Sequence, residues 1–166
     1  YKMHSRNALK ENTDTGLKRL RIHIKACGSI KARNKGKAIH ALIDSLGLSG
    51  RKDIIVGNAL IDMYSKFGLL DFAQAVFDKL QARDVVSWTA LISGYGQLGQ
   101  VDHAIYLFSK MIGEGIEPDN ITFTVLLNAC SHGGLLDEGH MYFEAMSQSF
   151  GIVPTVEHHS CMVNLL

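Results

Sequence analysis

The sequence lacks the patterns of β-structure, membrane spans and disulfide frameworks. No stretch alternates apolar and polar residues long enough to predict a strand. No apolar run reaches the roughly 20 residues that a helix needs to cross a bilayer, so we expect no contact with a membrane. The three cysteines, Cys27, Cys130 and Cys161, are odd in number, which argues against a disulfide framework and suits a reducing compartment.

Motifs for metal binding and catalysis are also missing from the sequence. None of the eight histidines pairs with a cysteine at zinc-finger spacing, and neither H-x-E nor P-C-x-x-C, the two elements of a zinc deaminase, occurs. Gly94, Gly96 and Gly99 follow a helical pattern rather than a strand, so their spacing does not predict a phosphate-binding loop. We therefore expect this segment to hold no cofactor or metal ion and not to be an enzyme.

What the chain does contain is a repeated pattern. Four kinds of position return at intervals of 31 and then 35 residues. They are Gly68, Gly99 and Gly134; Asp71, Asp102 and Asp137; Ala73, Ala104 and Gly139; and Phe77, Phe108 and Phe143. A period between about 20 and 50 residues is typical of a solenoid, in which no unit buries its apolar face alone.

Each unit of the pattern predicts two helices with a glycine between them. The second helix carries an apolar stripe at i, i+3, i+4 and i+7, and a shorter stripe precedes it. Asp119 and Thr155 follow prolines and are expected to cap the next helix. The pattern predicts an all-α fold, an α-α superhelix of helical hairpins. The expected pairs lie near 54–66 and 70–81, 86–98 and 101–114, and 121–132 and 136–148.

These residues resemble a known family. The segments "NALIDMYSKFGLLDFAQAVFDKL", "DVVSWTALISGYGQLGQVDHAIYLFSKMIGEGIEPD" and "ITFTVLLNACSHGGLLDEGHMYFEAM" look like pentatricopeptide repeats (PPR). Their lengths and order resemble the plant PLS subclass, the organellar RNA-editing type. Ala26-Cys27 and Gly36 mark an earlier, worn copy. The resemblance implies a linker or imperfect half-repeat at 1–16, long-type repeats at 17–53 and 120–155, a short-type repeat at 54–84, a standard repeat at 85–119 and the start of a short-type repeat at 156–166.

The first helix of each unit carries a polar residue three positions after an aliphatic one, as in Ile55 and Asn58. Spacing alone leaves two interpretations open: a ladder that contacts nucleobases, or a merely solvated helix face. The family resemblance favours the ladder, with the fifth and last residues of a repeat contacting one base. It implies an RNA-binding set of Asn58 with Asp84 (favouring uracil), Thr89 with Asp119 (favouring guanine), Ile55 and Val86 between bases, Thr124 with Thr155, which is no clear code pair, and Ser160. It also implies that His158-His159 is structural.

Charge is distributed unevenly along the chain. Residues 1–37 hold 11 Lys and Arg against two acidic residues, whereas residues 38–166 hold 6 against 14. The basic segment is either a phosphate-binding surface or a solvated one. In the worn repeat the resemblance places Lys18 and Arg21 at the base-contacting positions and Asp53 last, and two cations suit phosphate better than a base.

The resemblance implies a sequence-specific module for single-stranded RNA in an organellar RNA-processing factor, most concretely a C-to-U editing specificity factor. The alternative is a helical-repeat scaffold for proteins or a structural subunit of an organellar assembly. We expect a mitochondrial or chloroplast location, a monomer, and editing-complex proteins or a deaminase in trans as further partners. A deaminase domain beyond Leu166 is the other arrangement that the subclass implies.

Overall fold

The computed structural model describes residues 2–45 and 54–166, with side chains from Thr15 onward. The described chain contains helices and no strands, which confirms the all-α prediction. The helices are α1 (Lys2–Ser29), α2 (Arg33–Ser45), α3 (Ile54–Lys66), α4 (Leu70–Lys79), α5 (Val85–Gln97), α6 (Val101–Gly113), α7 (Asn120–Gly133), α8 (Leu136–Gln148) and α9 (Val156–Leu165). None of them is long and apolar enough to span a bilayer.

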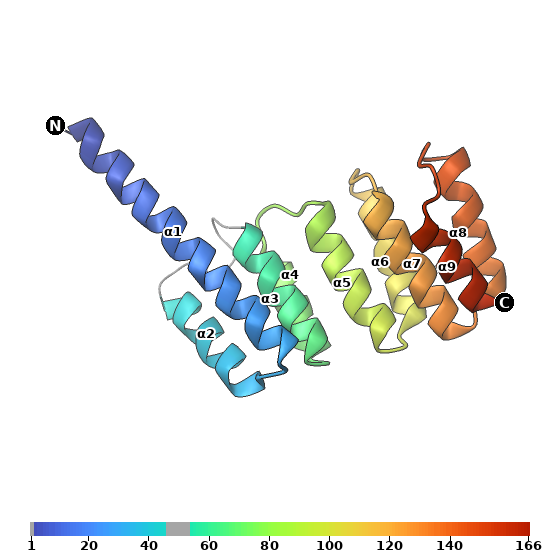
Figure 1. Ribbon diagram of the computed structural model, residues 1–166, viewed down its shortest axis with the longest axis horizontal. Coiled ribbons are helices and arrows are strands. Elements are labelled where there is room, and N and C mark those ends of the chain that lie inside the picture. The colour runs from blue at the N-terminus through green and yellow to red at the C-terminus, as the bar shows by residue number, and fades with distance from the viewer. Residues whose placement is uncertain (1, 46–53) are drawn as a thin grey trace.

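The helices form two layers (Figure 1). Helices α1, α3, α5, α7 and α9 stack side by side and are called the front layer here; α2, α4, α6 and α8 form the back layer. Each front helix that is followed by a back helix contacts it, as well as the neighbouring front helices. The three hairpins from 54 to 148 agree with the predicted pairs to within a few residues at each end.

Glycines turn the chain between the two helices of each hairpin. Gly68, Gly99 and Gly134 have φ values of 72°, 75° and 66°. This left-handed conformation costs glycine little conformational energy, whereas it is strained for residues with a Cβ. The recurring glycine of the sequence pattern is therefore a helix-ending residue, as predicted.

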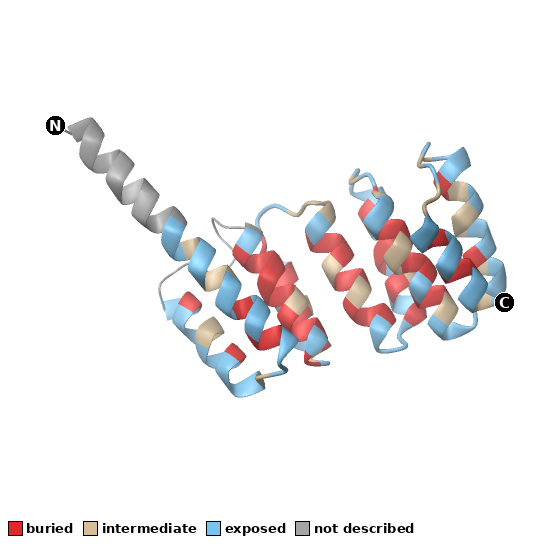
Figure 2. Ribbon diagram, in the orientation of Figure 1, coloured by how far each residue is buried: buried red, intermediate tan, exposed pale blue. Residues whose placement is uncertain are grey.

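The core extends along the whole stack instead of forming one centre, as the red segments of Figure 2 show. Phe77 of α4 packs edge-to-face on Trp88 of α5 with ring centroids 4.7 Å apart. Phe108 of α6 meets Phe123 of α7 in the same way at 5.5 Å. These back helices thus seal the boundary between two front helices, which is how a solenoid shares its apolar surface.

The N-terminal segment is helical. A linker or imperfect half-repeat is expected at 1–16, and this assignment stays a prediction; α1 runs without a break from Lys2 to Ser29. The segment contains no proline, and Gly16 alone costs a helix only about 1 kcal/mol. Residues 2–16 therefore extend the first front helix. Tyr1 and residues 46–53, with the predicted repeat end at Asp53, lie outside the described residues.

Candidate functional site

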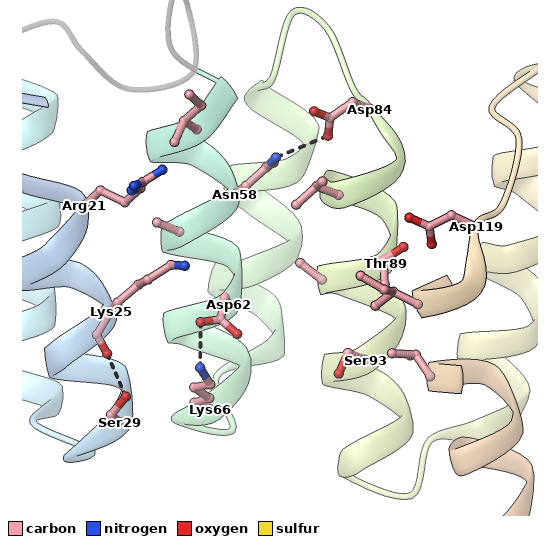
Figure 3. A pocket seen from close by; sticks show the side chains of 16 residues that line it. Arg21, Lys25, Ser29, Asn58, Asp62, Lys66, Asp84, Thr89, Ser93 and Asp119 are labelled. Carbon is pink, nitrogen blue, oxygen red and sulfur yellow. Dashed lines mark hydrogen bonds and ion pairs between the residues drawn. The ribbon is translucent and has the colours of Figure 1, made fainter. Parts of the chain in front are cut away.

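A groove of about 630 Å³ runs across the front layer. Figure 3 shows its lining, which comes from α1, α3, α5 and α7 and from the loops that precede α5 and α7. The polar part of the lining includes Asn58, Thr89, Asp84 and Asp119. The structure thus brings together the two polar pairs that the sequence singled out.

Asn58 and Asp84 are joined at the junction of α3 with α5. The amide Nδ2 of Asn58 donates to Oδ1 of Asp84 over 3.2 Å. Between them lies Ser87, whose hydroxyl is 2.7 Å from Asn58 Oδ1 and 2.9 Å from Asp84 Oδ1. Asn58 is 9% exposed and Ser87 is fully buried, so Ser87 lies beneath the groove while Asn58 and Asp84 form part of its lining.

The same construction explains why Asp84 stands where it does. Asp84 is the N-cap of α5: its carboxylate accepts from the backbone N–H of Ser87, while the Ser87 hydroxyl faces the backbone N–H of Asp84. This reciprocal arrangement is a capping box. Desolvation alone would raise the pKa of Asp84, but the hydrogen bonds from Ser87 and Asn58 outweigh it, so the pKa is lowered from its ordinary value. The carboxylate is thus ionised as it faces the groove.

The junction of α5 with α7 repeats this plan with other residues. Asp119 caps α7, and its carboxylate accepts from the backbone N–H and the hydroxyl of Thr122, both at 2.8 Å. The Thr122 hydroxyl lies 2.8 Å from that of Thr89. Thr89 at this junction therefore corresponds to Asn58 at the first junction, and Thr122 corresponds to Ser87.

The junction of α7 with α9 carries the third predicted pair, Thr124 and Thr155, but neither residue lines the groove. A buried histidine, His158, stands between them. Its Nδ1 accepts from the backbone N–H of Thr155, and its Nε2 lies 3.1 Å from the Thr124 hydroxyl. Ser160 is exposed on α9 and is likewise absent from the groove lining.

Aliphatic side chains stand beside the polar pairs. Ile55, Val86 and Ile121 are 52%, 54% and 64% exposed, and all three line the groove. Isolated exposed aliphatic residues are ordinary on protein surfaces. Three at the second position of successive front helices form a row of apolar surface, suited to packing against flat apolar faces.

One end of the groove is basic. Arg21 and Lys25 of α1 both line it, and Figure 3 shows both side chains directed toward α3. Among the described residues neither cation forms an ion pair, whereas Lys66 across the groove is bound to Asp62 at 2.7 Å. Arg21, predicted as a phosphate contact, thus stands beside the first polar pair. Within the same described part, no three His, Cys, Asp or Glu side chains gather to hold a metal ion.

The sequence predictions missed Ser87 and Thr122 as parts of this site. A signal was present, because Asp-x-x-Ser/Thr at the start of a helix is a capping pattern. Capping by Asp119 was predicted and is confirmed. The bond from the capping box back to the preceding repeat spans 29 residues in one case and 33 in the other. Its existence depends on how the front helices stack, which the pattern does not reveal.

Comparisons with known proteins agree with this architecture. Models of the PPR repeat match residues 58–85 and 121–149, and the model described as the PPR repeat family matches residues 83–132. Together these matches cover the hairpins that form most of the groove.

Similar sequences come from Arabidopsis thaliana. The chloroplastic pentatricopeptide repeat-containing protein CRR2 is 45% identical over 86% of this chain and 22% of its own length. The mitochondrial protein At5g40410 is 43% identical over 86% of this chain and 23% of its own length. The chain thus spans about a quarter of the length of these curated relatives.

Among solved structures, that of the pentatricopeptide repeat protein PPR10 in complex with an 18-nucleotide psaJ RNA element matches with a TM-score of 0.77. The sequences are 25% identical, and the match covers 96% of this chain and 24% of PPR10. The fold found here is therefore similar to one that has been observed with RNA bound.

Proposed function

This chain belongs to the pentatricopeptide repeat family, and on that basis we propose that its groove binds single-stranded RNA and selects it by sequence. The observation that carries the proposal is the pairing of Asn58 with Asp84 and of Thr89 with Thr122 and Asp119 at the groove. Each pair holds amide, hydroxyl or carboxylate groups in one position, next to an exposed aliphatic side chain. An unstacked base offers a polar edge and an apolar face that fit these two surfaces.

The base preference follows from the pairs. Asn58 with Asp84 is the pair that favours uracil in the family, and Thr89 with Asp119 is the pair that favours guanine. An amide offers N–H donors and a carbonyl acceptor on two separate atoms, whereas a hydroxyl donates and accepts through one oxygen, so exchanging them changes the base edge that is matched. With the protein's N-terminus toward the 5′ end of the RNA, the two units select 5′-U-G-3′.

The basic end of the groove is suited to an RNA phosphate. Arg21 and Lys25 precede the Asn58 unit and lie in the same groove. Cations in a binding groove attract phosphate without regard to base identity. We place the phosphate 5′ of the selected uracil there.

The wider role is proposed from the subclass that the repeats resemble. The repeat lengths and order favour the PLS subclass, and with it an organellar factor that selects a site for C-to-U editing. The named relatives include chloroplastic and mitochondrial proteins, so the location proposed is one of these two organelles. In this proposal the C-to-U reaction itself is carried out by a deaminase, either in trans or elsewhere in the full-length protein.

A binding assay with the full-length protein tests this function. The RNAs are identical single strands that carry all 16 dinucleotides at the two selected positions, in competition at fixed salt. U-G is expected to bind best, and each mismatch is expected to cost about 1–3 kcal/mol, the range found for base mismatches in protein–DNA sites. Equal affinity for all 16 RNAs would contradict base selection, and absence of RNA binding would favour the protein scaffold instead.

A further inference from the structure

The side of a front helix that meets the preceding repeat is buried in α3, α5 and α7. The third residue of α5, Ser87, hydrogen-bonds to Asn58 of α3. The third residue of α7, Thr122, lies 2.8 Å from the Thr89 hydroxyl of α5 in the same way. The seventh residues lie on the same side, one turn further along each helix. The third and seventh residues of the three helices are at most 1% exposed: Val56, Leu60, Ser87, Leu91, Thr122 and Leu126.

The corresponding side of α1 carries Arg19 and His23. The recurring Ala-Cys pair aligns Cys27 of α1 with Cys130 of α7. In that register Arg19 matches the third residue of α7, and His23 matches the seventh. Both side chains are exposed, and Ile22 between them is 62% exposed. On this side, which we call the outer side of α1, a guanidinium and an imidazole thus stand where the other front helices bury aliphatic or hydroxyl side chains.

A further repeat packed on the outer side of α1 would bury both of these groups. Burial of a charged guanidinium is strongly unfavourable, and the observed boundaries place valine, serine or threonine at its position. A solenoid needs a polar outer face on its terminal repeat, because that face meets solvent instead of a neighbour. The residues on the outer side of α1 fit such a terminal face.

The backbone before α1 also differs from that before the later front helices. Helices α5, α7 and α9 each begin after an extended N-cap residue that follows a loop from the preceding back helix; these residues are Asp84, Asp119 and Thr155. Helix α1 has no such start at residue 16, because it continues back to Lys2, and Figure 1 shows this part projecting away from the stack. Helix therefore occupies the place of the loop that would bring in a preceding back helix.

Positive charge is concentrated on α1. Its described side chains include no acidic residue and four cations: Lys18, Arg19, Arg21 and Lys25. Arg21 and Lys25 line the groove, whereas Arg19 lies on the outer side, so the charge continues from the groove across the helix. A guanidinium binds phosphate without regard to base identity. The polyanionic backbone of RNA therefore complements α1, while residues 38–166 are net acidic.

We propose that α1 forms the N-terminal boundary of the base-selecting stack. No further repeat packs on its outer side, and the RNA chain 5′ of the selected uracil crosses α1 held through its phosphates alone. Any chain that precedes α1 in the full-length protein is then no further repeat of this stack. The part that concerns RNA rests on the proposed function, because it says where base selection begins, whereas the packing of α1 does not depend on RNA.

Thiol labelling of the full-length protein tests the packing of α1. His23→Cys places a thiol on the outer side, and Lys110→Cys places one on the exposed surface of the back helix α6 as the matched control. Cys130 is the slow reference, because it is completely buried and its burial raises the pKa of the thiol to about 11. The thiol of His23→Cys is expected to react about as fast as that of Lys110→Cys, as measured by peptide mass spectrometry without RNA. Reaction as slow as that of Cys130 would show that a neighbour covers this side and would overturn the inference.

Binding of the full-length protein to single-stranded RNAs tests where base selection begins. The RNAs keep U-G and vary, one at a time, the nucleotides of a short 5′ flank. Their affinities are expected to agree within about twofold, whereas replacing the U or the G weakens binding by about tenfold or more. A preference of about tenfold at any nucleotide of the flank would overturn the inference. If replacing the U or the G has no effect either, the proposed function fails together with the RNA part of this inference, and the labelling result decides the packing of α1.

A charge reversal tests the phosphate contact on α1 itself. Arg19→Glu and the matched control Lys110→Glu change the net charge of the protein equally, and both side chains are exposed. Arg19→Glu is expected to weaken binding of RNA with the 5′ flank by about two- to fivefold, the size of an exposed ion pair, and to leave RNA that begins at U-G unaffected. Lys110→Glu is expected to show no such dependence on the flank. Equal effects of the two variants on the flanked RNA would overturn the proposed path of the RNA across α1.

Discussion

Asn58 and Asp84 are hydrogen-bonded to each other across a repeat boundary, with 3.2 Å between the amide nitrogen and the carboxylate oxygen. They are 26 residues apart in the chain and belong to different front helices or their caps. A residue that caps a helix is thereby also tied to the side chain proposed to contact a base. Local helix chemistry and the geometry of the groove depend on the same carboxylate.

Substitution of Thr89 is expected to change which base is selected. Thr89→Asn converts the Thr89–Asp119 pair into the type formed by Asn58 and Asp84, because an amide replaces a hydroxyl. The preference at that nucleotide should move from guanine to uracil, by about 1–3 kcal/mol. The measurement is competition binding of the full-length protein to RNAs that differ at one nucleotide.

The reciprocal substitution is the matched control for Thr89→Asn. Asn58→Thr should move the preference at the neighbouring nucleotide from uracil to guanine and leave the Thr89 position unchanged. If either variant loses affinity equally for every RNA without a change of preference, these side chains are scaffold only.

The basic end of the groove is expected to act without regard to sequence. Arg21→Ala and Lys25→Ala each remove a cation that lines the groove, so affinity should fall equally for all RNAs. The slope of log affinity against log salt should decrease by about 0.7 for each phosphate of a single strand that is no longer neutralised. Lys110→Ala, an exposed cation on the back helix α6, serves as the control and should change neither quantity. A change of base preference in Arg21→Ala would contradict a phosphate contact.

The sequence was sufficient to predict the hairpins because their signals are local. Gly68, Gly99 and Gly134 end helices through their own backbone conformation, and each apolar stripe identifies the face that must be buried. The continuity of α1 through residue 16 was not predicted, because turn-forming residues such as Asn12 and Asp14 are also tolerated inside a helix.

The candidate site could be predicted only in part. Asn58, Thr89, Asp84 and Asp119 were named from the resemblance, and the structure places all four at the groove. Thr124, Thr155 and Ser160 were also named, and they lie outside its lining. His158 occupies the third position of α9, as Ser87 and Thr122 do in α5 and α7, and its ring contacts Thr124 of the preceding front helix. This contact with a residue 34 positions earlier becomes visible only when the front helices are stacked.

Loss of a shared aromatic contact is expected to destabilise the stack. Phe77 is 2% exposed and packs on Trp88 of the next front helix, so Phe77→Ala should lower the free energy of unfolding by about 3–5 kcal/mol. Phe72 lies on the same helix but is 45% exposed, and Phe72→Ala should cost clearly less. Urea unfolding of both variants gives the comparison. Equal losses would show that the boundary between these repeats is not where burial stabilises the fold.

The capping box at Asp84 predicts a pH dependence of stability. The pKa of this carboxyl is lowered in the folded chain, because the hydrogen bonds from Ser87 and Asn58 outweigh its partial burial. The ionised form therefore contributes stability above the ordinary pKa of 3.8, and this contribution disappears as the pH falls through the lower, folded value.

Urea unfolding between about pH 2 and pH 6, compared for the unmodified protein and Asp84→Asn, isolates the effect because asparagine does not titrate. The stability difference between the two proteins should be constant near pH 6 and shift against the unmodified protein below about pH 4. A difference that stays constant down to about pH 2 would mean that the Asp84 carboxylate is no better stabilised in the folded chain than in the unfolded one.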